Sequence, residues 1–325
     1  MIWSISGYKQ FRKCARQWYY RNIVADGRVK NDSFRKEITI LSKLQTIEAW
    51  RGGIVDDIIS RLLVSAINKK IPIDKNYYLR EAEKIFDAQF EYAVFQKYRE
   101  ADMKISGNSN FAAFLKSEAG EDILNEEIDK ARKDIETALT NLLDDNDFIA
   151  YLHSASHLVS QRALIYPLDR FNVKAIPDLI AFFDNAPPHI FDWKVHTYGT
   201  NTYDEQLISY AAALYKVAHS KPHVDFPKNI TDYQIFDYRI TEYQLLHKER
   251  IKRDYEITYE RLEELGATMS GSIMEMYMAG GHKKYSELSP ENFETTSFIE
   301  NCLNCPFKNN CKTHDHDIRN KYLQN

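Results

Sequence analysis

The positions of four cysteines constrain this sequence more than any other feature. Cys14 stands alone near the N-terminus, and Cys302, Cys305 and Cys311 follow near the other end with C-x2-C-x5-C spacing. Four thiolates can close a site around a zinc ion or a 4Fe-4S cluster. Such a site would join the first helix to the C-terminal tail, so the sequence predicts that the two ends of the chain are held together by one metal site.

The cysteine spacing favours iron-sulfur over zinc. Structural zinc sites usually draw on two short cysteine pairs, whereas this chain offers a singleton and a triplet. Zinc is the alternative, and four unrelated reduced cysteines are a third interpretation. Disulfides are disfavoured, because the N-terminal residues MIWSISGYKQF contain no apolar signal segment. We therefore expect a cytoplasmic protein with reduced cysteines.

Composition and charge narrow the class of protein further. The 325 residues are 44% hydrophobic, and no apolar run is long enough to span a membrane. The net charge of -4 argues against a general nucleic-acid coat, but residues 1–50 carry ten Lys/Arg against four Asp/Glu. Residues 116–147 carry four Lys/Arg against eleven Asp/Glu. The basic region could contact phosphates, and the acidic region could equally be a solvated helix face.

Helical patterns dominate the first half of the chain. The segment SGYKQFRKCARQWYYRN predicts an N-terminal helix capped by Ser4 or Ser6, with Cys14 in its middle. A second helix is predicted over EAWRGGIVDDIISRLLVSAI, and periodic apolar residues continue through 76–100 and 121–143. Residues 60–155 are therefore expected to form a helical block.

Strand patterns begin near residue 160. The segment ALIYPLDRFNVKAIPDLIAFFDNAPPHIFDWKVHT predicts two or three antiparallel strands with a turn near 184–188. A helix over YDEQLISYAAALYKVAH and a strand pair in DYQIFDYRI and EYQLLHKERI should follow, which gives an α/β fold. The expected segments are N-terminal helices at 1–60, a helical insertion at 61–157, a core at 158–290 and a cysteine-bound tail at 291–325.

Three residues of the expected strands can carry chemistry. Asp178 follows Pro177, and Asp192 and Lys194 lie on the next strand, separated from it by one hairpin. Residues i and i+2 of a strand share a face, and carboxylates at one end of adjoining strands can converge on one cation. Two carboxylates suit Mg2+ or Mn2+, and a lysine beside them can orient water or a phosphate. The pattern is typical of phosphodiester hydrolysis.

The helix after this hairpin completes a recognisable set of motifs. It carries Gln206 and Tyr210, four residues apart and so on one helical face. With the Pro-Asp strand and Asp192-Trp193-Lys194, the chain resembles the PD-(D/E)xK nuclease superfamily, and within it the RecB-like group with a Q-x-x-x-Y motif. The resemblance implies a restriction-endonuclease-like core, in which Gln206 steers the nucleophile and Tyr210 supports the strand path.

The resemblance extends to both ends of the chain. Cys14-Ala15-Arg16-Gln17-Trp18-Tyr19 is similar to the opening helix of the iron-sulfur members, in AddB and in the exonucleases that accompany CRISPR adaptation, although their Pro is missing here. The terminal triplet matches the three remaining cluster ligands of these proteins. The resemblance therefore implies that a 4Fe-4S cluster is held by Cys14, Cys302, Cys305 and Cys311.

One position departs from the family pattern. The second helix of the family commonly has a Gly followed four residues later by a metal-binding His, and here Asp56 stands at that register after Gly52. A carboxylate can replace imidazole on Mg2+ or Mn2+. We expect Asp56 to join Asp178 and Asp192 as a metal ligand, with Asp57 as the fallback and a solvent-facing carboxylate as the simpler interpretation.

These features predict a Mg2+- or Mn2+-dependent deoxyribonuclease, an exonuclease on single-stranded DNA ends that serves DNA repair or antiviral defence. Arg16, Trp18 and Tyr19 are candidate DNA contacts, although such aromatic residues more often lie in the core. No phosphate-binding loop is present, so unwinding would need a helicase or defence-complex partner. The alternative is a catalytically dispensable nucleic-acid-binding scaffold with a structural Zn or Fe-S site.

Overall fold

A five-stranded sheet forms the centre of the protein. The computed structural model describes residues 1–29, 31–100, 107–196 and 204–311. The strand order is β2-β5-β6-β7-β8, and neighbours are antiparallel except β6 and β7, which run parallel. The strands are β2 (His157–Ser160), β5 (Leu179–Phe182), β6 (His189–Lys194), β7 (Arg239–Gln244) and β8 (Lys252–Tyr255).

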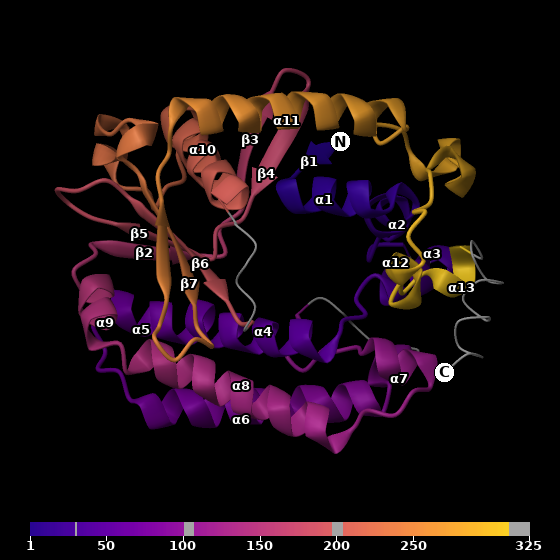
Figure 1. The fold of residues 1–325 in the computed structure, drawn as a ribbon, viewed down its shortest axis with the longest axis horizontal. Helices are drawn as coiled ribbons and strands as arrows, with labels where there is room; N and C mark the ends of the chain where they lie inside the picture. The colour runs from indigo at the N-terminus through magenta and orange to yellow at the C-terminus, as the bar shows by residue number, and fades with distance from the viewer. Residues whose placement is uncertain (30, 101–106, 197–203, 312–325) are drawn as a thin grey trace.

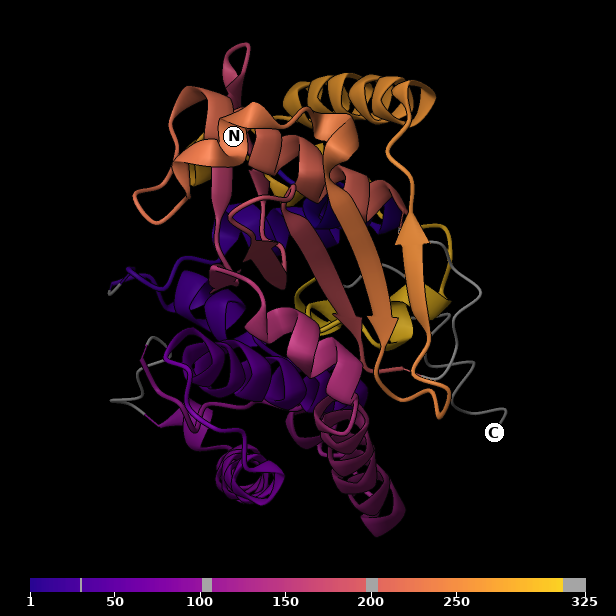
Figure 2. The same cartoon turned by 90° about the vertical axis from the view of Figure 1, so that its left-hand side faces the viewer.

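Helices cover both faces of this sheet (Figures 1 and 2). One face carries Ile180 and Ile190 and packs on α10 (Asp204–Ser220), which in turn packs on α11 (Tyr259–Met278). The opposite face carries Leu179 and Phe191, which belong to a second core under the helical block. Successive side chains of a strand point to opposite faces, so one sheet separates two cores and the fold is α/β, as expected.

The predicted helical block is confirmed in the part of the chain that the structure describes. Its long helices lie beneath the sheet in Figure 2, and one face of α8 is buried, although Leu124 just before it is exposed. None of the described helices is both long and apolar enough to cross a membrane. The helices are α4 (Ile47–Asp57), α5 (Val64–Asn68), α6 (Lys75–Val94), α7 (Leu115–Ala119), α8 (Asn125–Leu143) and α9 (Asn146–His153).

Two predictions about the strands need correction. The hairpin of β3 (Leu164–Leu168) and β4 (Phe171–Ala175) does not join β5 in one meander, but forms a separate sheet with β1 (Ile2–Trp3). The expected strand pair at 233–251 is also displaced: β7 is built from RITEYQ, and its partner β8 lies beyond a turn. The predicted turn between β5 and β6 is confirmed.

The N-terminal helix is broken at Cys14, where a continuous helix was expected. The Cys14 backbone is extended (φ -166°, ψ 108°), and its sulfur accepts a hydrogen bond from the Gln17 backbone N–H at 3.4 Å. Cys14 therefore ends one helix and caps the next. The helices of this region are α1 (Ile5–Lys13), α2 (Ala15–Tyr19) and α3 (Ser33–Leu41), and the tail contributes α12 (Glu300–Leu303) and α13 (Lys308–Cys311).

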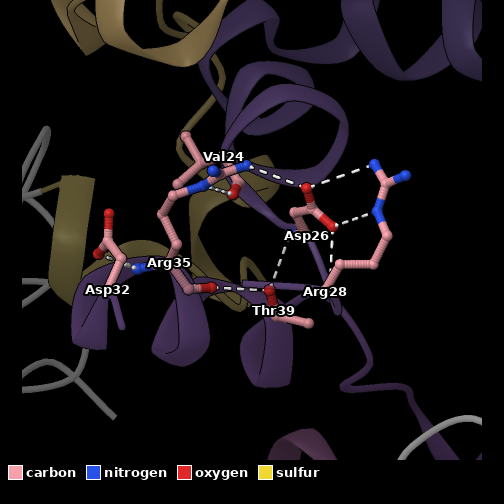
Figure 3. A network of polar contacts seen from close by, with 6 residues as sticks. All are labelled: Val24, Asp26, Arg28, Asp32, Arg35 and Thr39. Atoms are coloured by element: carbon pink, nitrogen blue, oxygen red, sulfur yellow. Dashed lines mark hydrogen bonds and ion pairs between the residues drawn. The ribbon is translucent and has the colours of Figure 1, made fainter. Parts of the chain in front are cut away.

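A polar network fixes α3 against the segment that follows α2 (Figure 3). Arg35 donates from Nε to the Val24 carbonyl at 2.8 Å and lies 3.5 Å from an Asp26 oxygen. The Asp26 backbone N–H donates to Thr39 Oγ1 at 2.9 Å. The Arg35 guanidinium also lies over the Tyr285 ring, 4.9 Å from its centroid. Arg35 thus connects the N-terminal helices with the C-terminal part of the chain.

Helix α8 supports the ends of strands β6 and β7. Arg51 of α4 forms a buried ion pair with Asp134 of α8, and its Nη2 donates to the Val195 carbonyl at 3.3 Å. Asn141 donates from Nδ2 to the Leu245 carbonyl at 2.8 Å. These bonds hold the ends of β6 and β7 against the helical block, which gives the insertion a supporting role.

We expect Asp134→Ala to lower the free energy of unfolding by about 3 kcal/mol, because it leaves the buried Arg51 guanidinium without its carboxylate. Urea denaturation measures this loss. Asp129→Ala is the matched control, since Asp129 is exposed on the same helix. Equal stability of the two variants would contradict the bracing role.

Candidate active site

Asp178 and Asp192 lie opposite each other on neighbouring chain segments. Leu179 of β5 pairs with Phe191 of β6, and the same register places Asp178 across from Asp192. Asp178 Oδ2 accepts a hydrogen bond from the Trp193 backbone N–H at 2.9 Å. The antiparallel hairpin therefore brings the two carboxylates together, as the sequence predicted.

Lys194 and α10 complete the surroundings of Asp192. Asp192 is only 2% exposed, and Lys194 Nζ forms an ion pair with it. Gln206 donates from Nε2 to Asp192 Oδ1 at 3.2 Å and contacts Tyr210 Oη at 2.5 Å. The glutamine and tyrosine of α10 thus share the site with the strand residues.

Asp56 reaches the same site from the end of α4. Asp56, Asp178 and Lys194 line one cavity together with Gly52. Asp57 instead forms an ion pair with Arg61 on the exposed side of the helix and does not line that cavity. The geometry therefore favours Asp56 over Asp57 as the carboxylate of the site.

Two polar residues of the site were missed in the sequence. Gln161 follows β2, and its Nε2 lies 2.9 Å from Asp56 Oδ1 and 3.1 Å from Asp178 Oδ1. Glu242 of β7 pairs in register with Asp192, is fully buried and accepts a hydrogen bond from Tyr255 Oη at 2.8 Å. An acidic residue inside the strand segment RITEYQ was a usable signal for Glu242. Gln161 gave none, because its role depends on how β2 pairs with β5.

Burial and mutual repulsion raise the pKa values of the three carboxyl groups. Burial, then Asp192 and Asp56, raise the pKa of Asp178 to about 8. Burial is also the main cause that raises the pKa of Asp192, although Lys194 opposes it. Burial raises the pKa of Asp56 to about 6, while the hydrogen bond from Gln161 acts in the opposite direction. The charged forms of these carboxyl groups are therefore penalised, and a bound cation would favour them.

The donors of this site fit a divalent metal ion. Carboxylate oxygens are the ligands that Mg2+ and Mn2+ prefer, and the buried carboxylates lie beside a cavity. Within the described residues, no group of three or more His, Cys, Asp or Glu side chains already stands in metal-binding geometry.

The four cysteines meet in a second place. All four are free thiols that line one pocket, and Gln17 Nε2 lies 3.7 Å from Cys305 Sγ. Burial raises the pKa of the Cys305 thiol to about 11. Thiolate sulfurs are the donors that iron-sulfur clusters and zinc take, and here they come from both ends of the chain, but among the described residues no three of them stand in the geometry of a metal site.

The structure contradicts two of the three predicted DNA contacts in α2, Trp18 and Tyr19. Trp18 and Tyr19 are 3% and 2% exposed, and the Tyr19 ring stacks on Phe293 with 4.6 Å between centroids. Arg16 donates from Nε to the Phe293 carbonyl at 3.1 Å. The two aromatic rings hold the tail in the core and are not available to stack on bases.

The fold and this site define a nuclease of the kind built on paired strand carboxylates. A family model for the PD-(D/E)XK nuclease superfamily matches residues 2–312, and the chain belongs to this superfamily. Among solved structures, a candidate exonuclease from Eubacterium rectale is 12% identical, covering 83% of this chain and 91% of that one, with a TM-score of 0.36. No curated protein matches the chain.

The raised pKa of Asp178 predicts how the metal-free protein responds to pH. Between about pH 4 and 8 the folded state binds more protons than the unfolded state, so the free energy of unfolding should fall as pH rises. The slope should reach at most about 1.4 kcal/mol per pH unit for one proton. Urea denaturation in EDTA from pH 5 to 9 measures it.

Asp178→Asn should flatten this dependence, because the asparagine carries no titrating proton. Asp184→Asn in the exposed turn of the same hairpin should keep the slope of the unmodified protein. An unchanged slope in Asp178→Asn would show that this carboxyl group does not titrate in the expected window.

Proposed function

We propose that this protein is a Mg2+- or Mn2+-dependent deoxyribonuclease, acting as an exonuclease on single-stranded DNA ends. One observation carries the proposal: Asp178 and Asp192 lie opposite each other in a buried site, with Lys194 and Asp56 at the same cavity. The superfamily membership supports nuclease chemistry with a divalent metal. The preference for DNA and for free ends is drawn from the resemblance to RecB-like exonucleases.

Each residue of the site has a separate role in the proposed phosphodiester hydrolysis. A divalent ion held by Asp178, Asp192 and Asp56 would supply Lewis-acid chemistry and neutralise charge on the phosphate. Lys194 forms an ion pair with Asp192, and its ammonium could orient water or the scissile phosphate. Gln206 holds the orientation of Asp192 and can steer the attacking water, while Tyr210 supports Gln206.

We further propose that the four cysteines hold a structural 4Fe-4S cluster, which would place the protein in the iron-sulfur RecB-like group. The pocket that they share, and the hydrogen-bond donor that Gln17 directs at Cys305, support this assignment. Zinc is the alternative metal. A role in DNA repair or antiviral defence, with a helicase partner, stays a prediction.

Asp192→Ala should lower cleavage by at least about 10³-fold, since it removes a carboxylate that the metal requires. Lys194→Ala should do nearly the same, and both proteins should remain folded. The assay uses anaerobically purified protein, end-labelled single-stranded DNA, duplex DNA and RNA, and added Mg2+ or Mn2+. Asp184→Ala is the control from the same hairpin, and full turnover by Asp192→Ala would refute the active-site assignment.

Cys14→Ser and Cys14→Ala separate two roles of one sulfur. Serine keeps an acceptor for the cap of α2, worth about 1 kcal/mol, but is a poor cluster ligand. Both variants should therefore lose iron, brown colour and thermal stability, and alanine should lose slightly more. Iron content, visible absorbance and Tm measure the effects. An iron-free variant with the Tm of the unmodified protein would exclude a structural cluster, and a colourless protein with stoichiometric zinc would favour the alternative metal.

A further inference from the structure

Gln161 occupies a backbone conformation that side chains rarely adopt. Its φ of 49° lies in the left-handed region, which glycine adopts without strain but which is strained for a residue with a Cβ. A strained residue is retained only where the surrounding structure or a function compensates for the strain. A glutamine at this position therefore calls for a reason that lies in its side chain.

That side chain connects two carboxylates from different parts of the fold. Its carboxamide nitrogen has two hydrogens, and it lies 2.9 Å from Asp56 Oδ1 and 3.1 Å from Asp178 Oδ1. Asp178 belongs to the sheet and is also held by the Trp193 backbone N–H. Asp56 belongs to α4. Gln161 is therefore a direct link between the helix carboxylate and the strand carboxylates.

The loop at Gln161 has other anchors that do not need the carboxamide. The Gln161 backbone N–H donates to the Asp178 carbonyl at 3.2 Å, which continues the pairing of β2 with β5. The next residue, Arg162, forms an ion pair with Asp225 and a hydrogen bond of 3.1 Å to the same carboxylate. Because these contacts already fix the loop, the loop does not need the Gln161 carboxamide to keep its conformation.

We infer that Gln161 is a positioning residue that holds the Asp56 carboxylate against Asp178 and so completes the divalent-cation site from α4. This inference rests on the proposed function. By donating to Oδ1 of each carboxylate, Gln161 draws the two groups together before a cation binds. Asp56 Oδ2 would then remain available to a cation, and the amide carries no charge that would repel it.

The central test is Gln161→Gly, studied by calorimetric titration of the full-length protein with Mn2+ in the absence of DNA. Glycine relieves the left-handed strain, so Tm should be equal to or above that of the unmodified protein. The Kd for Mn2+ should rise at least about tenfold, and high Mn2+ should restore cleavage. A loss of metal affinity without a loss of stability is an outcome that a purely structural glutamine would not give.

Two further variants keep the test decisive. Gln161→Asn tolerates the left-handed conformation but is one methylene shorter, so it should also weaken Mn2+ binding. Gln96→Gly is the matched control, because Gln96 has the same φ of 49° and donates its carboxamide to the Ser117 carbonyl in the helical block. It should leave the Kd unchanged.

A double-mutant cycle identifies the partner through which Gln161 acts. In an Asp56→Ala background, Gln161→Gly should change the Kd by less than about threefold, because the group that it positions is gone. Equal shifts in both backgrounds would overturn the link to Asp56, and an unchanged Kd in Gln161→Gly would overturn the inference as a whole. If the unmodified protein neither bound Mn2+ nor cleaved DNA, the proposed function itself would fail.

Discussion

Repulsion between closely placed carboxylates is the constraint around which the rest of this structure is arranged. Asp178 and Asp192 are held together by the register of a hairpin, and Asp56 approaches them from a helix. Burial and proximity both penalise the charged forms, which is why the pKa values of these groups rise. The arrangement is tolerable because Lys194, Gln206 and other donors compensate part of the charge. It is useful because a cation can compensate the rest.

The surrounding fold supplies the rigidity that such a site needs. One face of the sheet packs on α10, which delivers Gln206, and the other face rests on the helical block. The buried pair of Arg51 and Asp134 joins that block to the carbonyl after Lys194. Because the sheet is packed on both faces, the carboxyl groups cannot move far apart, and without a cation their repulsion is relieved by protonation, as the raised pKa of Asp178 indicates.

The sequence allowed the central site to be predicted because its parts are encoded locally. Asp178, Asp192 and Lys194 lie on one hairpin, and Gln206 and Tyr210 are one helical turn apart, so the motifs that carry the resemblance to the nuclease superfamily can be read from short segments. Gln161 could not be found this way, since its role arises from the pairing of β2 with β5. The break at Cys14 could not be predicted either, because one extended residue interrupts the helix without changing its pattern of apolar residues.

Other errors had different physical causes. Trp18 and Tyr19 fit a binding surface as well as a core, and only the packing of Phe293 decides between them. Helix α11 was not anticipated, because Gly266 and Gly271 lower its intrinsic helix propensity. Burial of its apolar face outweighs that preference. Strand β1 is two residues long, which is too short for the alternation of apolar and polar residues to be recognised.

The closing of the chain on itself has a consequence for the order in which the protein is made. The N-terminal helices pack against residues that lie close to position 300: the Arg16 backbone N–H bonds to Glu294, and the Tyr20 ring lies 5.3 Å from that of Phe307. The five-stranded sheet that includes β5 and β6 is complete by Tyr255. During translation the N-terminal helices therefore emerge long before the C-terminal residues that they pack against. The five-stranded sheet can form before these two ends of the chain come together.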